Sequence, residues 1–597
     1  MRSSFLSPFR FYLVYCSIFF VFCLLGGRLV YLQVVKGPAL LESAESARKN
    51  FSAMRARRGD VVDAKGNLLA TTRSVVEVGL DPQCVNPEDL RKLPKLASLL
   101  GLEEYKVREA FLTKTRRGKD FEGEVRQIRW TKLVDEVEED VYRKIKELNI
   151  RGLYGNYKHS RLYPNKKLAA HVIGFVNKEG LAAMGVERMA DYYLSGQDGW
   201  RESECDGKRR ELLQYRSREV PPVDGLNIEL SVDRMIQDVV EKELTNIVEE
   251  FDPVSASIIV SEPATGYVLA MGNAPDFDPN LFNKAEMNHQ RNRALTDLYE
   301  PGSTFKIVAS GAAMNENLVT KDTVVDCSKP SVFRGNRKYR LPRDHHPLGK
   351  ISVHEVMVNS SNRGAGQLGV ILGRSRLYEY CRAFGFGQST DLGLRGERKG
   401  ILHAPDRWDG LTITRLPMGH AVSVTPMQIH SAMGAVANDG VLMKPQLIRR
   451  VFDAEGKTVV EFRPKSVRRV LRSDVAESLT DMLVGVVEEG TAKKAQVVGY
   501  RVAGKTGTTQ KIVDGRYSNR HHVASFVGFL PADDPRLMVT VMVDEPKMQG
   551  ARLGYGGSVA GPAFSRVAKS VAGYLGIMPS EQKKELAALP SRLSQRL

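Results

Sequence analysis

The sequence is poor in cysteine and tryptophan and has few long apolar runs. Its 597 residues include six cysteines and three tryptophans, and no two cysteines form a Cys-x-x-Cys pair. A disulfide scaffold and a structural zinc site are therefore not expected. No long apolar run follows the N-terminal one, which excludes a protein that crosses a membrane many times. Hydrophobic residues still make up 42% of the chain, which excludes a largely disordered protein and allows several domains.

Acidic residues are outnumbered by basic ones. The chain has 87 Lys and Arg against 70 Asp and Glu, so its formal net charge is +17. This surplus favours an anionic partner such as a lipid surface, an acidic polymer or a carboxylate substrate, and by itself it does not select nucleic acid. We predict no nucleic-acid partner, and we interpret basic runs such as Lys114-Thr-Arg-Arg-Gly-Lys119 as exposed faces.

The one long apolar run lies at the N-terminus. Residues 11–27 hold no charged side chain, and the run continues past Arg28 to Leu32. A helix of this length can cross a bilayer of roughly 30 Å, with Arg28 snorkelling. Arg2 and Arg10 precede it, so the positive-inside tendency places the N-terminus in the cytoplasm and everything after about residue 36 outside. A cleaved signal peptide is the alternative, but its apolar core is usually shorter and is followed by a small-x-small site.

Residues 36–225 predict an α+β segment without an obvious catalytic cluster. Apolar residues spaced by three and four predict one helix with a core-facing stripe. These residues are Val134, Val137, Val141, Ile145 and Leu148. Short apolar runs predict strands at residues 75–80 and 171–176.

Residues 226–578 predict one large domain with a mainly antiparallel sheet and helices. A helical pattern begins at Val232, and a Pro-Ala-Thr-Gly turn joins two predicted strands at 256–260 and 266–272. Further strands are predicted at 523–530 and 537–543, and a helix at 476–489. The tail, 579–597, is polar and is expected to be loosely held.

Three short strings in this domain can carry chemistry together: Ser303-Thr-Phe-Lys306, Ser360-Ser-Asn362 and Lys505-Thr506-Gly507. If Pro301 and Gly302 introduce a helix, Ser303 and Lys306 lie one turn apart on the same face. Serine needs an adjacent base to become a nucleophile, and burial beside other cations lowers a lysine pKa enough to supply one. Ser360 and Asn362 offer a hydroxyl and an amide to the same network. Lys505 on a strand adds positive potential beside an edge that can pair with an extended peptide.

The order and separation of the strings carry more weight than any one of them. The first and second lie about 55 residues apart and the second and third about 145, and this triplet is known from penicillin-binding proteins and β-lactamases. The chain resembles the class B penicillin-binding proteins along nearly its whole length. Four further strings resemble the family's N-terminal motifs: Arg58-Gly59-Asp60, Asp63-Ala-Lys-Gly66, Arg161-Leu-Tyr-Pro164 and Gly185-Val-Glu187. Two others resemble the division-specific (septal) branch more than the elongation branch: Tyr299-Glu-Pro-Gly-Ser-Thr-Phe-Lys306 and Ala524-Ser-Phe-Val-Gly-Phe529.

The resemblance implies a fold and a domain order. The fold class is α+β, with a cytoplasmic stub and transmembrane anchor at 1–35 and an extended pedestal (dimerisation-type) domain at 36–225. Residues 226–578 would form a penicillin-binding/β-lactamase-like serine transpeptidase domain with an antiparallel sheet and helices. The tail at 579–597 would complete the chain. No cofactor and no metal are implied.

The resemblance also implies a role for each site residue. Ser303 would attack the carbonyl of the penultimate D-Ala of a stem peptide, Lys306 would be its base, and Ser360 and Asn362 would relay protons and orient the substrate. Lys505, Thr506, Gly507 and Thr508 would form the substrate-binding strand, with Lys505, Thr506 and Thr508 facing the terminal carboxylate. The backbone N–H groups of Ser303 and Thr508 would form the oxyanion hole. β-Lactams would acylate the same serine.

The implied partners are stem peptides, both as D-Ala-D-Ala donors and as amine acceptors, and β-lactam antibiotics. A glycan polymerase of the SEDS family, other membrane proteins of the division machinery and the lipid bilayer are implied through the anchor and the pedestal. The implied location is the bacterial inner (plasma) membrane, with one span, a cytoplasmic N-terminus and a periplasmic or extracellular catalytic domain.

Three other patterns in the sequence resemble known sites. The string from Gly499 to Thr506 satisfies the Walker A pattern of a P-loop NTPase, and residues 537–545 imitate a Walker B strand. A phosphate loop must lead straight into a helix, however, and this string is followed by β-branched residues and glycines, which argues against the P-loop hypothesis. Gly556-Gly-Ser558-Val-Ala560 lacks the last glycine of a hydrolase elbow and fits a helix start better. A group of histidines in polar, loop-like stretches lacks the helical spacing of a zincin site. These are His345, His346, His354, His521 and His522.

Other functions of the same fold also stay open. A β-lactamase needs a group that activates water against the acyl-enzyme, and no such glutamate can be assigned. A non-enzymatic division scaffold is possible through residues 36–225, although the intact Ser303, Lys306 and Lys505 argue against loss of activity. An elongation-specific transpeptidase is the alternative within the class.

Overall fold

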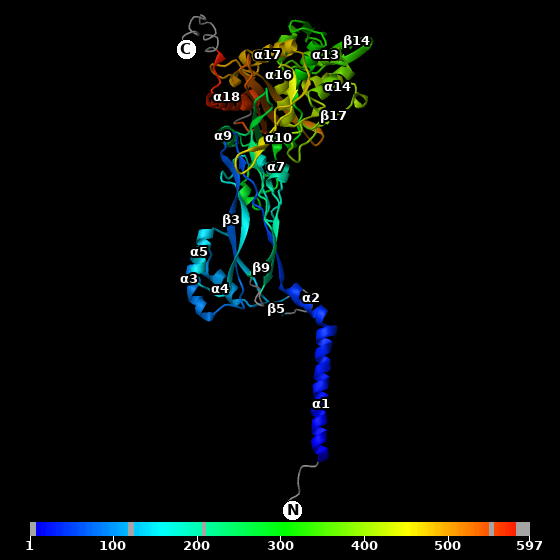
Figure 1. Ribbon diagram of the computed structural model, residues 1–597. Helices are drawn as coiled ribbons and strands as arrows, with labels where there is room; N and C mark the ends of the chain where they lie inside the picture. Colours follow the sequence, from blue (N-terminus) through cyan, green and yellow to red (C-terminus); the bar gives the residue numbers. More distant parts are fainter. Residues whose placement is uncertain (1–7, 118–124, 206–210, 549–553, 581–597) are drawn as a thin grey trace, which may run out of the picture. The chain divides into compact units, whose positions relative to one another are not determined.

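The computed structural model describes residues 8–117, 125–205, 211–548 and 554–580 (Figure 1). The chain divides into two compact units. The first consists of Met1–Arg57 and Ser195–Gly225, and the second of Arg58–Leu194 and Leu226–Leu597. Of the predicted tail, only Pro579 and Ser580 are described, and the Ser580 N–H donates to the carbonyl of Gly499. The rest of the tail and Lys119 of the basic run lie outside the described residues.

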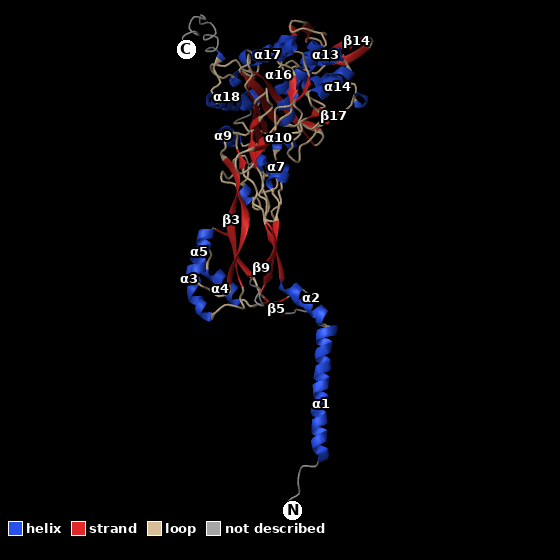
Figure 2. Ribbon diagram, viewed as in Figure 1, coloured by secondary structure: helices blue, strands red, loops and turns tan. Residues whose placement is uncertain are grey.

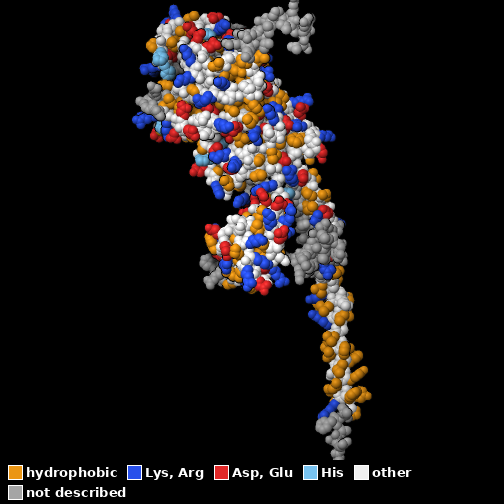
Figure 3. Space-filling model, turned by 90° about the vertical axis from the view of Figure 1, so that its left-hand side faces the viewer, with side chains coloured by type: hydrophobic (Ala, Val, Ile, Leu, Met, Phe, Trp, Pro, Cys, Tyr) orange, Lys and Arg blue, Asp and Glu red, His pale blue; other side chains and the backbone are white. Residues whose placement is uncertain are grey.

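The first unit carries the apolar helix. Helix α1 (Pro8–Val30) continues into a short π-helical stretch, η1 (Tyr31–Val35), and the 28 residues form a candidate membrane span with no buried side chain. Figure 3 shows the apolar side chains along this helix. Helix α2 (Gly37–Arg48) follows, and then β1 (Lys49–Met54) pairs antiparallel with β8 (Gly199–Cys205), which pairs with β9 (Glu211–Val220). Because a fully exposed apolar helix is unfavourable in water, α1 fits a membrane anchor.

In the second unit, a long ribbon precedes the large C-terminal domain. Strand β3 (Leu68–Leu80) pairs along its length with β7 (Leu153–Leu162) and also pairs with β6 (Thr131–Val137). Helices α3 (Leu93–Leu100), α4 (Glu104–Leu112) and α5 (Glu139–Glu147) share a separate hydrophobic core with these strands. The strand predicted at 75–80 is confirmed as the end of β3.

Two predictions in this region are wrong. The helix expected from Val134 begins only at Glu139, because Val134 and Val137 lie on β6 and pair with β3. Glu138 has an extended conformation and separates the two elements. The strand expected at 171–176 is instead a short helix, α6 (Ala170–Ile173), whose four residues are all buried. A short apolar run that is buried on all sides does not distinguish a strand from a helix.

Three of the four N-terminal strings, those that contain Arg58, Arg161 and Glu187, meet in a buried ion cluster. Glu187, which is fully buried, accepts hydrogen bonds from the Nε atoms of Arg58 at 2.6 Å and Arg161 at 2.7 Å. Arg161 also donates to the carbonyl of Gly59 at 2.7 Å, and Arg58 forms an ion pair with Asp191 at 2.6 Å. One carboxylate therefore ties together segments that lie far apart in the sequence.

A five-stranded antiparallel sheet forms the centre of the large C-terminal domain, in the order β12-β11-β25-β24-β23. The strands are β11 (Ser255–Ser261), β12 (Val268–Ala274), β23 (Ala503–Val513), β24 (Arg516–Leu530) and β25 (Leu537–Asp544). The predicted strands and the mainly antiparallel sheet are confirmed. Because β23 is an edge strand, one row of its backbone groups is free of sheet pairing.

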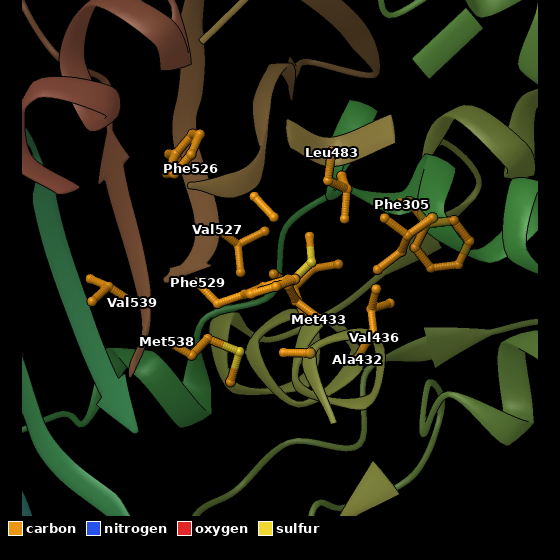
Figure 4. Packing of buried hydrophobic residues seen from close by; sticks show 14 of the residues in the cluster. Phe305, Ala432, Met433, Val436, Leu483, Phe526, Val527, Phe529, Met538 and Val539 are labelled. Carbon is orange, nitrogen blue, oxygen red and sulfur yellow. The ribbon is translucent and has the colours of Figure 1, made fainter. Parts of the chain in front are cut away.

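Helices cover both faces of this sheet (Figure 2). On one face lie α9 (Arg234–Phe251) and α18 (Gly556–Tyr574), with Phe564 of α18 against Phe526 of β24. The other face of the sheet is covered by α16 (Pro426–Ala437), whose His430 forms a hydrogen bond with Thr540 of β25. Helices α11 (Lys306–Asn315) and α17 (Ser473–Glu488) belong to the same hydrophobic core. Figure 4 shows Met433, Phe529 and Leu483 in this packing. The helices predicted from Val232 and at 476–489 are confirmed as α9, which Asp233 caps, and α17.

The remaining elements are shorter. The strands are β2 (Val61–Val62), β4 (Thr115–Arg117), β5 (Val125–Gln127), β10 (Asn227–Leu230), β13 (Val324–Asp326), β14 (Ser331–Arg334), β15 (Arg337–Arg340), β16 (Lys350–Ser352), β17 (Ile401–Leu402), β18 (Val422–Ser423), β19 (Val441–Met443), β20 (Ile448–Phe452), β21 (Thr458–Glu461) and β22 (Ser466–Arg469). The helices are α7 (Gly185–Met189), α8 (Asp191–Leu194), α10 (Arg293–Thr296), α12 (Val353–Val358), α13 (Asn362–Leu372), α14 (Arg374–Ala383), α15 (Thr412–Arg415) and the 3-10 turns η2 (Pro87–Lys92), η3 (Pro279–Leu281), η4 (Gly302–Phe305), η5 (Pro405–Arg407), η6 (Leu416–Met418) and η7 (Lys493–Ala495).

Candidate active site

Ser303 lies on a rigid turn between the sheet and the helices. The turn is η4, which continues directly into α11 from Lys306, so the predicted helical placement of the two side chains is confirmed. Gly302 has φ +57°, and a Cβ added there would lie 2.4 Å from Oγ1 of Thr509. Phe305 is fully buried and packs on Phe386. Only glycine therefore fits the position before Ser303, and the turn has little freedom to move.

The Lys306 amine is the centre of a hydrogen-bond network. Its Nζ lies 3.0 Å from Oγ of Ser303, 3.0 Å from Oγ of Ser360 and 2.9 Å from Oδ1 of Asn362. It also donates to the backbone carbonyl of Ser360. The first two predicted strings are thus brought together around one nitrogen.

The surroundings of this amine favour its neutral form. Lys306 is fully buried, and burial together with the nearby charge of Lys505 lowers its pKa well below the ordinary lysine value. A neutral amine has two hydrogens, and the carbonyl of Ser360 and Oδ1 of Asn362 can only accept. With both hydrogens donated to these two oxygens, the lone pair is left for the hydroxyl hydrogen of Ser303.

Ser360 connects Ser303 to Lys505. Its Oγ donates to Oγ of Ser303 at 2.9 Å and accepts from Nζ of Lys505 at 3.1 Å. Its backbone lies in the left-handed region, with φ +55°, which is uncommon for a residue other than glycine. This conformation turns both the carbonyl and the hydroxyl of one residue toward Lys306. A proton can therefore pass between Ser303 and the lysines through a single hydroxyl.

Sequence reasoning missed Asp344, which holds the second string in place. Its Oδ1 accepts from the backbone N–H groups of Asn362 and Arg363, and its Oδ2 accepts from Oγ of Ser361 at 2.9 Å. These N–H groups open α13, where a negative charge is favourable. The Asn362 amide is oriented by its Nδ2, which donates to the carbonyl of Arg343 at 3.2 Å. Asp344 precedes the string by 16 positions in a loop, so no local spacing points to it.

The third string lies on β23, as predicted. Lys505 is fully buried, and burial lowers the pKa of its ammonium group to about 7. A Cβ on Gly507 would lie 3.0 Å from the carbonyl of Pro301, so this glycine lets the strand approach the Ser303 turn. Lys505 therefore joins Ser303, Lys306, Ser360 and Asn362 in one network, and Gly507 packs beside it.

The two threonines of the strand point elsewhere. Oγ1 of Thr506 lies 2.9 Å from Oγ1 of Thr491, and Oγ1 of Thr508 accepts from the N–H of Gly556 at 3.0 Å. In the described chain neither hydroxyl is hydrogen-bonded to the network around Lys306. Because side chains alternate along a strand, Thr506 and Thr508 share the face opposite Lys505.

A second polar group missed in the sequence lies at the foot of the Ser303 turn. Oε2 of Glu300 lies 3.0 Å from Nδ1 of His420 and accepts from the hydroxyl of Tyr517 at 3.1 Å, and Oε1 accepts from the N–H of Ala421. These bonds hold the pKa of Glu300 below its ordinary value despite burial, which acts in the opposite direction. The group connects the turn to β24. It borders a cavity of about 460 Å³.

The competing sites do not form. After Lys505 the chain continues as strand to Val513, so the P-loop hypothesis is wrong. Gly556 begins α18, and Ser558 Oγ donates to the carbonyl of Tyr555 within its first turn, which fits a helix start. The expectation that all five histidines lie in loops is wrong for His354 on α12 and for the pair on β24. In the described ranges no group of three or more His, Cys, Asp or Glu could hold a metal ion.

Comparisons with known proteins agree with this architecture. Residues 256–569 match the penicillin binding protein transpeptidase domain, and residues 53–230 match the penicillin-binding protein dimerisation domain. The stage V sporulation protein D of Bacillus subtilis is 34% identical, over 95% of this chain and 85% of its own. The peptidoglycan D,D-transpeptidase FtsI of Escherichia coli is 28% identical, over 97% and 94%.

A solved structure is similar over most of the chain as well. The crystal structure of penicillin binding protein 3 from Mycobacterium tuberculosis, complexed with aztreonam, superposes with a TM-score of 0.67 at 27% identity. The match covers 89% of this chain and 98% of that one. The chain therefore belongs to the class B penicillin-binding proteins, the serine-type peptidoglycan D,D-transpeptidases.

Proposed function

We propose that this protein cross-links peptidoglycan stem peptides through an acyl-enzyme on Ser303. The observation that carries the proposal is the network in which a buried lysine with a lowered pKa lies 3.0 Å from the serine hydroxyl. Such a contact between a nucleophile and a base is what serine acyl transfer requires. The sheet edge beside the network offers a place for an extended peptide.

The first half of the reaction forms the acyl-enzyme. Oγ of Ser303 attacks the carbonyl carbon of the penultimate D-Ala, and its proton passes to Nζ of Lys306. The C–N bond to the terminal D-Ala then breaks, and the leaving amine takes a proton from Lys306 through the hydroxyl of Ser360. The N–H groups of Ser303 and Thr508 would bind the oxyanion, and such a donor contributes roughly 3–4 kcal/mol in serine hydrolases.

The second half transfers the acyl group. The amine of a neighbouring stem peptide attacks the ester carbon, its proton returns through Lys306, and Oγ of Ser303 leaves as the hydroxyl. The products are a new peptide bond and the free enzyme, so no cofactor is needed. A β-lactam would acylate Ser303 by the first half alone, with its ring amide as the bond that breaks.

The carboxylate end of the donor would lie against the other side of the β23 edge. Because Oγ1 of Thr508 already accepts from Gly556, its own hydrogen is free to donate to a carboxylate. Thr506 shares that face, and the Lys505 ammonium supplies a positive charge nearby. We assign substrate binding to Lys505, Thr506, Gly507 and Thr508 on this basis.

The charge of Lys505 predicts a pH dependence. Since its pKa is about 7, the free enzyme loses this positive charge as the pH rises through about 7. The second-order rate constant for acylation by an anionic β-lactam should therefore fall about tenfold on the alkaline side, because the carboxylate loses the Coulomb attraction of a positive charge several ångströms away, which is roughly 1–3 kcal/mol. At saturating β-lactam the fall should be smaller, since the bound carboxylate raises the lysine pKa.

Lys505→Arg is the matched control for this profile. Arginine stays protonated throughout the range, so the alkaline fall should disappear whatever the absolute rate of the variant. An unchanged alkaline fall in Lys505→Arg would assign the titration to another group.

Turnover tests the proposed function. The protein is incubated with a synthetic stem pentapeptide ending in D-Ala-D-Ala and with an amine acceptor, and released D-Ala and cross-linked product are measured together. Equal amounts of both are expected, and neither is expected from Ser303→Ala. Release of D-Ala without cross-linked product would instead support a carboxypeptidase, and rapid hydrolysis of β-lactams would support a β-lactamase.

We propose a septal role and a membrane topology with the catalytic unit outside the cytoplasm. The strings Tyr299 to Lys306 and Ala524 to Phe529 support the septal branch, and α1 with Arg10 near its start supports a cytoplasmic N-terminus. A glycan polymerase of the SEDS family and other division proteins are the proposed membrane partners. A fluorescent fusion should gather at the division site, and a signal spread along the lateral wall would favour the elongation role.

A further inference from the structure

A basic β-hairpin precedes the loop that reaches Asn362 of the candidate active site. Strands β14 and β15 pair antiparallel from Ser331 to Arg340 (Figures 1 and 2). The thirteen residues from Ser331 to Arg343 include five cations and no acid. The cations are Arg334, Arg337, Lys338, Arg340 and Arg343, and all five are exposed. In the part of the chain that the structure describes, none of the five forms an ion pair with an acidic side chain.

The arrangement of charges on the hairpin lowers its stability. Register places Arg334 directly opposite Arg337, and like charges in this position repel each other. Lys338 lies opposite Phe333, with its ammonium group 6.0 Å from the centre of a ring that is 66% exposed. An exposed aromatic ring among unpaired cations stabilises the protein little. Together with the exposed cations around it, this ring offers an apolar and cationic surface to an anionic ligand.

The two faces of the hairpin have different surroundings. Side chains alternate, so Val332 and Tyr339 share the inner face, where Tyr339 packs against the main core. Phe333, Lys338 and Arg340 share the outer face, which is open to solvent. By the same alternation, Arg334 and Arg337 lie on the side of Val332 and Tyr339, but they are exposed because they are at the tip. We call the outer-face residues and these two tip residues together the basic hairpin surface: Phe333, Arg334, Arg337, Lys338 and Arg340.

The hairpin is fixed to the residues that build the network. Arg334 donates to the carbonyl of Val370 on α13, the helix that begins at Asn362. Four residues after Lys338 the chain reaches Pro342, which packs on α13 at Gly366. The next residue, Arg343, accepts from the side chain of Asn362. The basic hairpin surface is therefore held in a constant position relative to Ser303 and Lys306.

The root of the hairpin has a positive potential. Arg415 donates to the carbonyl of Arg340, and burial together with the charge of Arg340 lowers the pKa of the Arg415 guanidinium. Burial is the larger of these two causes, and the charge of Asp409 acts in the opposite direction. An anion that passes this point would relieve the repulsion.

We propose that the basic hairpin surface binds the carboxylates of stem peptides on a polymeric glycan strand while another peptide of the same strand reacts at Ser303. The inference rests on the proposed function, because it takes uncross-linked peptidoglycan as the substrate. Each stem peptide carries free carboxylates, and several peptides follow one another along a strand. The surface would therefore give the enzyme a preference for polymeric donors over isolated stem peptides.

The test compares Arg337→Glu/Lys338→Glu with Lys457→Glu/Lys465→Glu in the full chain. The control changes the same number of exposed cations to acids at the residues just before β21 and β22. Binding is measured with soluble, uncross-linked glycan strands that carry pentapeptides. Reversal at the hairpin should weaken binding at least about tenfold, and added NaCl should weaken wild-type binding. The control variant should bind like wild type.

Two further measurements separate failure of this proposal from failure of the proposed function. Acylation by fluorescent penicillin should proceed at the wild-type rate in the hairpin variant, which also shows that the variant folds. Absence of acylation in the wild type would refute the proposed function, whatever the binding result. Strands with amidated carboxylates should bind wild type as weakly as unmodified strands bind the hairpin variant.

Several outcomes would overturn the proposal. Equal affinity of the hairpin variant and wild type for unmodified strands would do so, and so would equal affinity of wild type for amidated and unmodified strands. Loss of binding to phosphatidylglycerol vesicles or to RNA, without loss on glycan strands, would assign the surface to a different anion.

Discussion

Lys306→Met is expected to slow acylation of Ser303 by about 10²–10⁴-fold, the usual contribution of a general base. Methionine has nearly the length of lysine but no nitrogen, so Ser303 keeps its position and loses the group that accepts its proton. The lost contacts include the 3.0 Å bond to Ser303 and the 2.9 Å bond to Asn362. The measurement is the rate of acylation by fluorescent penicillin at a saturating concentration.

The stability of the variant is the control. Burial lowers the pKa of Lys306, which means that the folded state disfavours the protonated form that the unfolded chain adopts at pH 7. Removing the amine removes this cost, which offsets part of the loss of its hydrogen bonds. Lys306→Met should therefore still unfold in one cooperative transition close to that of wild type. A variant that folds and is acylated within tenfold of the wild-type rate would show that another group is the base.

Glu187→Gln is expected to destabilise the second unit by about 3–5 kcal/mol, the usual cost of removing one partner from a buried ion pair. Its side chain has no exposed surface, and the side chains of Arg58 and Arg161 are 11% and 5% exposed. Glutamine keeps the size of the side chain but leaves two buried guanidinium groups without their shared counter-charge. The free energy of unfolding is measured by denaturant titration, with the intrinsic fluorescence of the protein as the signal.

Asp191→Asn is the matched control for this prediction. Asp191 pairs with the same Arg58 at 2.6 Å, but its side chain is 38% exposed. Water can replace this carboxylate, so a loss within about 1 kcal/mol is expected. Equal losses of unfolding free energy in the two variants would show that burial does not determine how much each carboxylate of the cluster contributes to stability.

The sequence pattern predicted the strands of the catalytic sheet because they are long, apolar and bounded by turn residues. It predicted the network around Lys306 because three strings at fixed separations identify a known arrangement. The pattern failed where burial or pairing overrides it. Val134 has helical spacing but pairs with β3, and the run at 171–176 is apolar in either a strand or a helix.

The residues that orient the site could not be predicted from the sequence. Asp344 acts through backbone N–H groups of a helix that begins 18 residues later, and Glu300 acts through partners on two distant segments. Neither spacing is local, so no periodicity or motif points to these contacts. The left-handed conformation of Ser360, whose carbonyl accepts from Lys306, was not predicted either, because the string contains no glycine to indicate it.

The most direct test of the account is the location of a covalent adduct. The protein is incubated with fluorescent penicillin, digested, and the labelled peptide is identified by mass spectrometry. We predict one adduct, on the peptide that contains Ser303, and none on Ser303→Ala. An unlabelled Ser303 peptide, or an equal yield of adduct from the Ser303→Ala protein, would contradict the claim that this hydroxyl is the nucleophile.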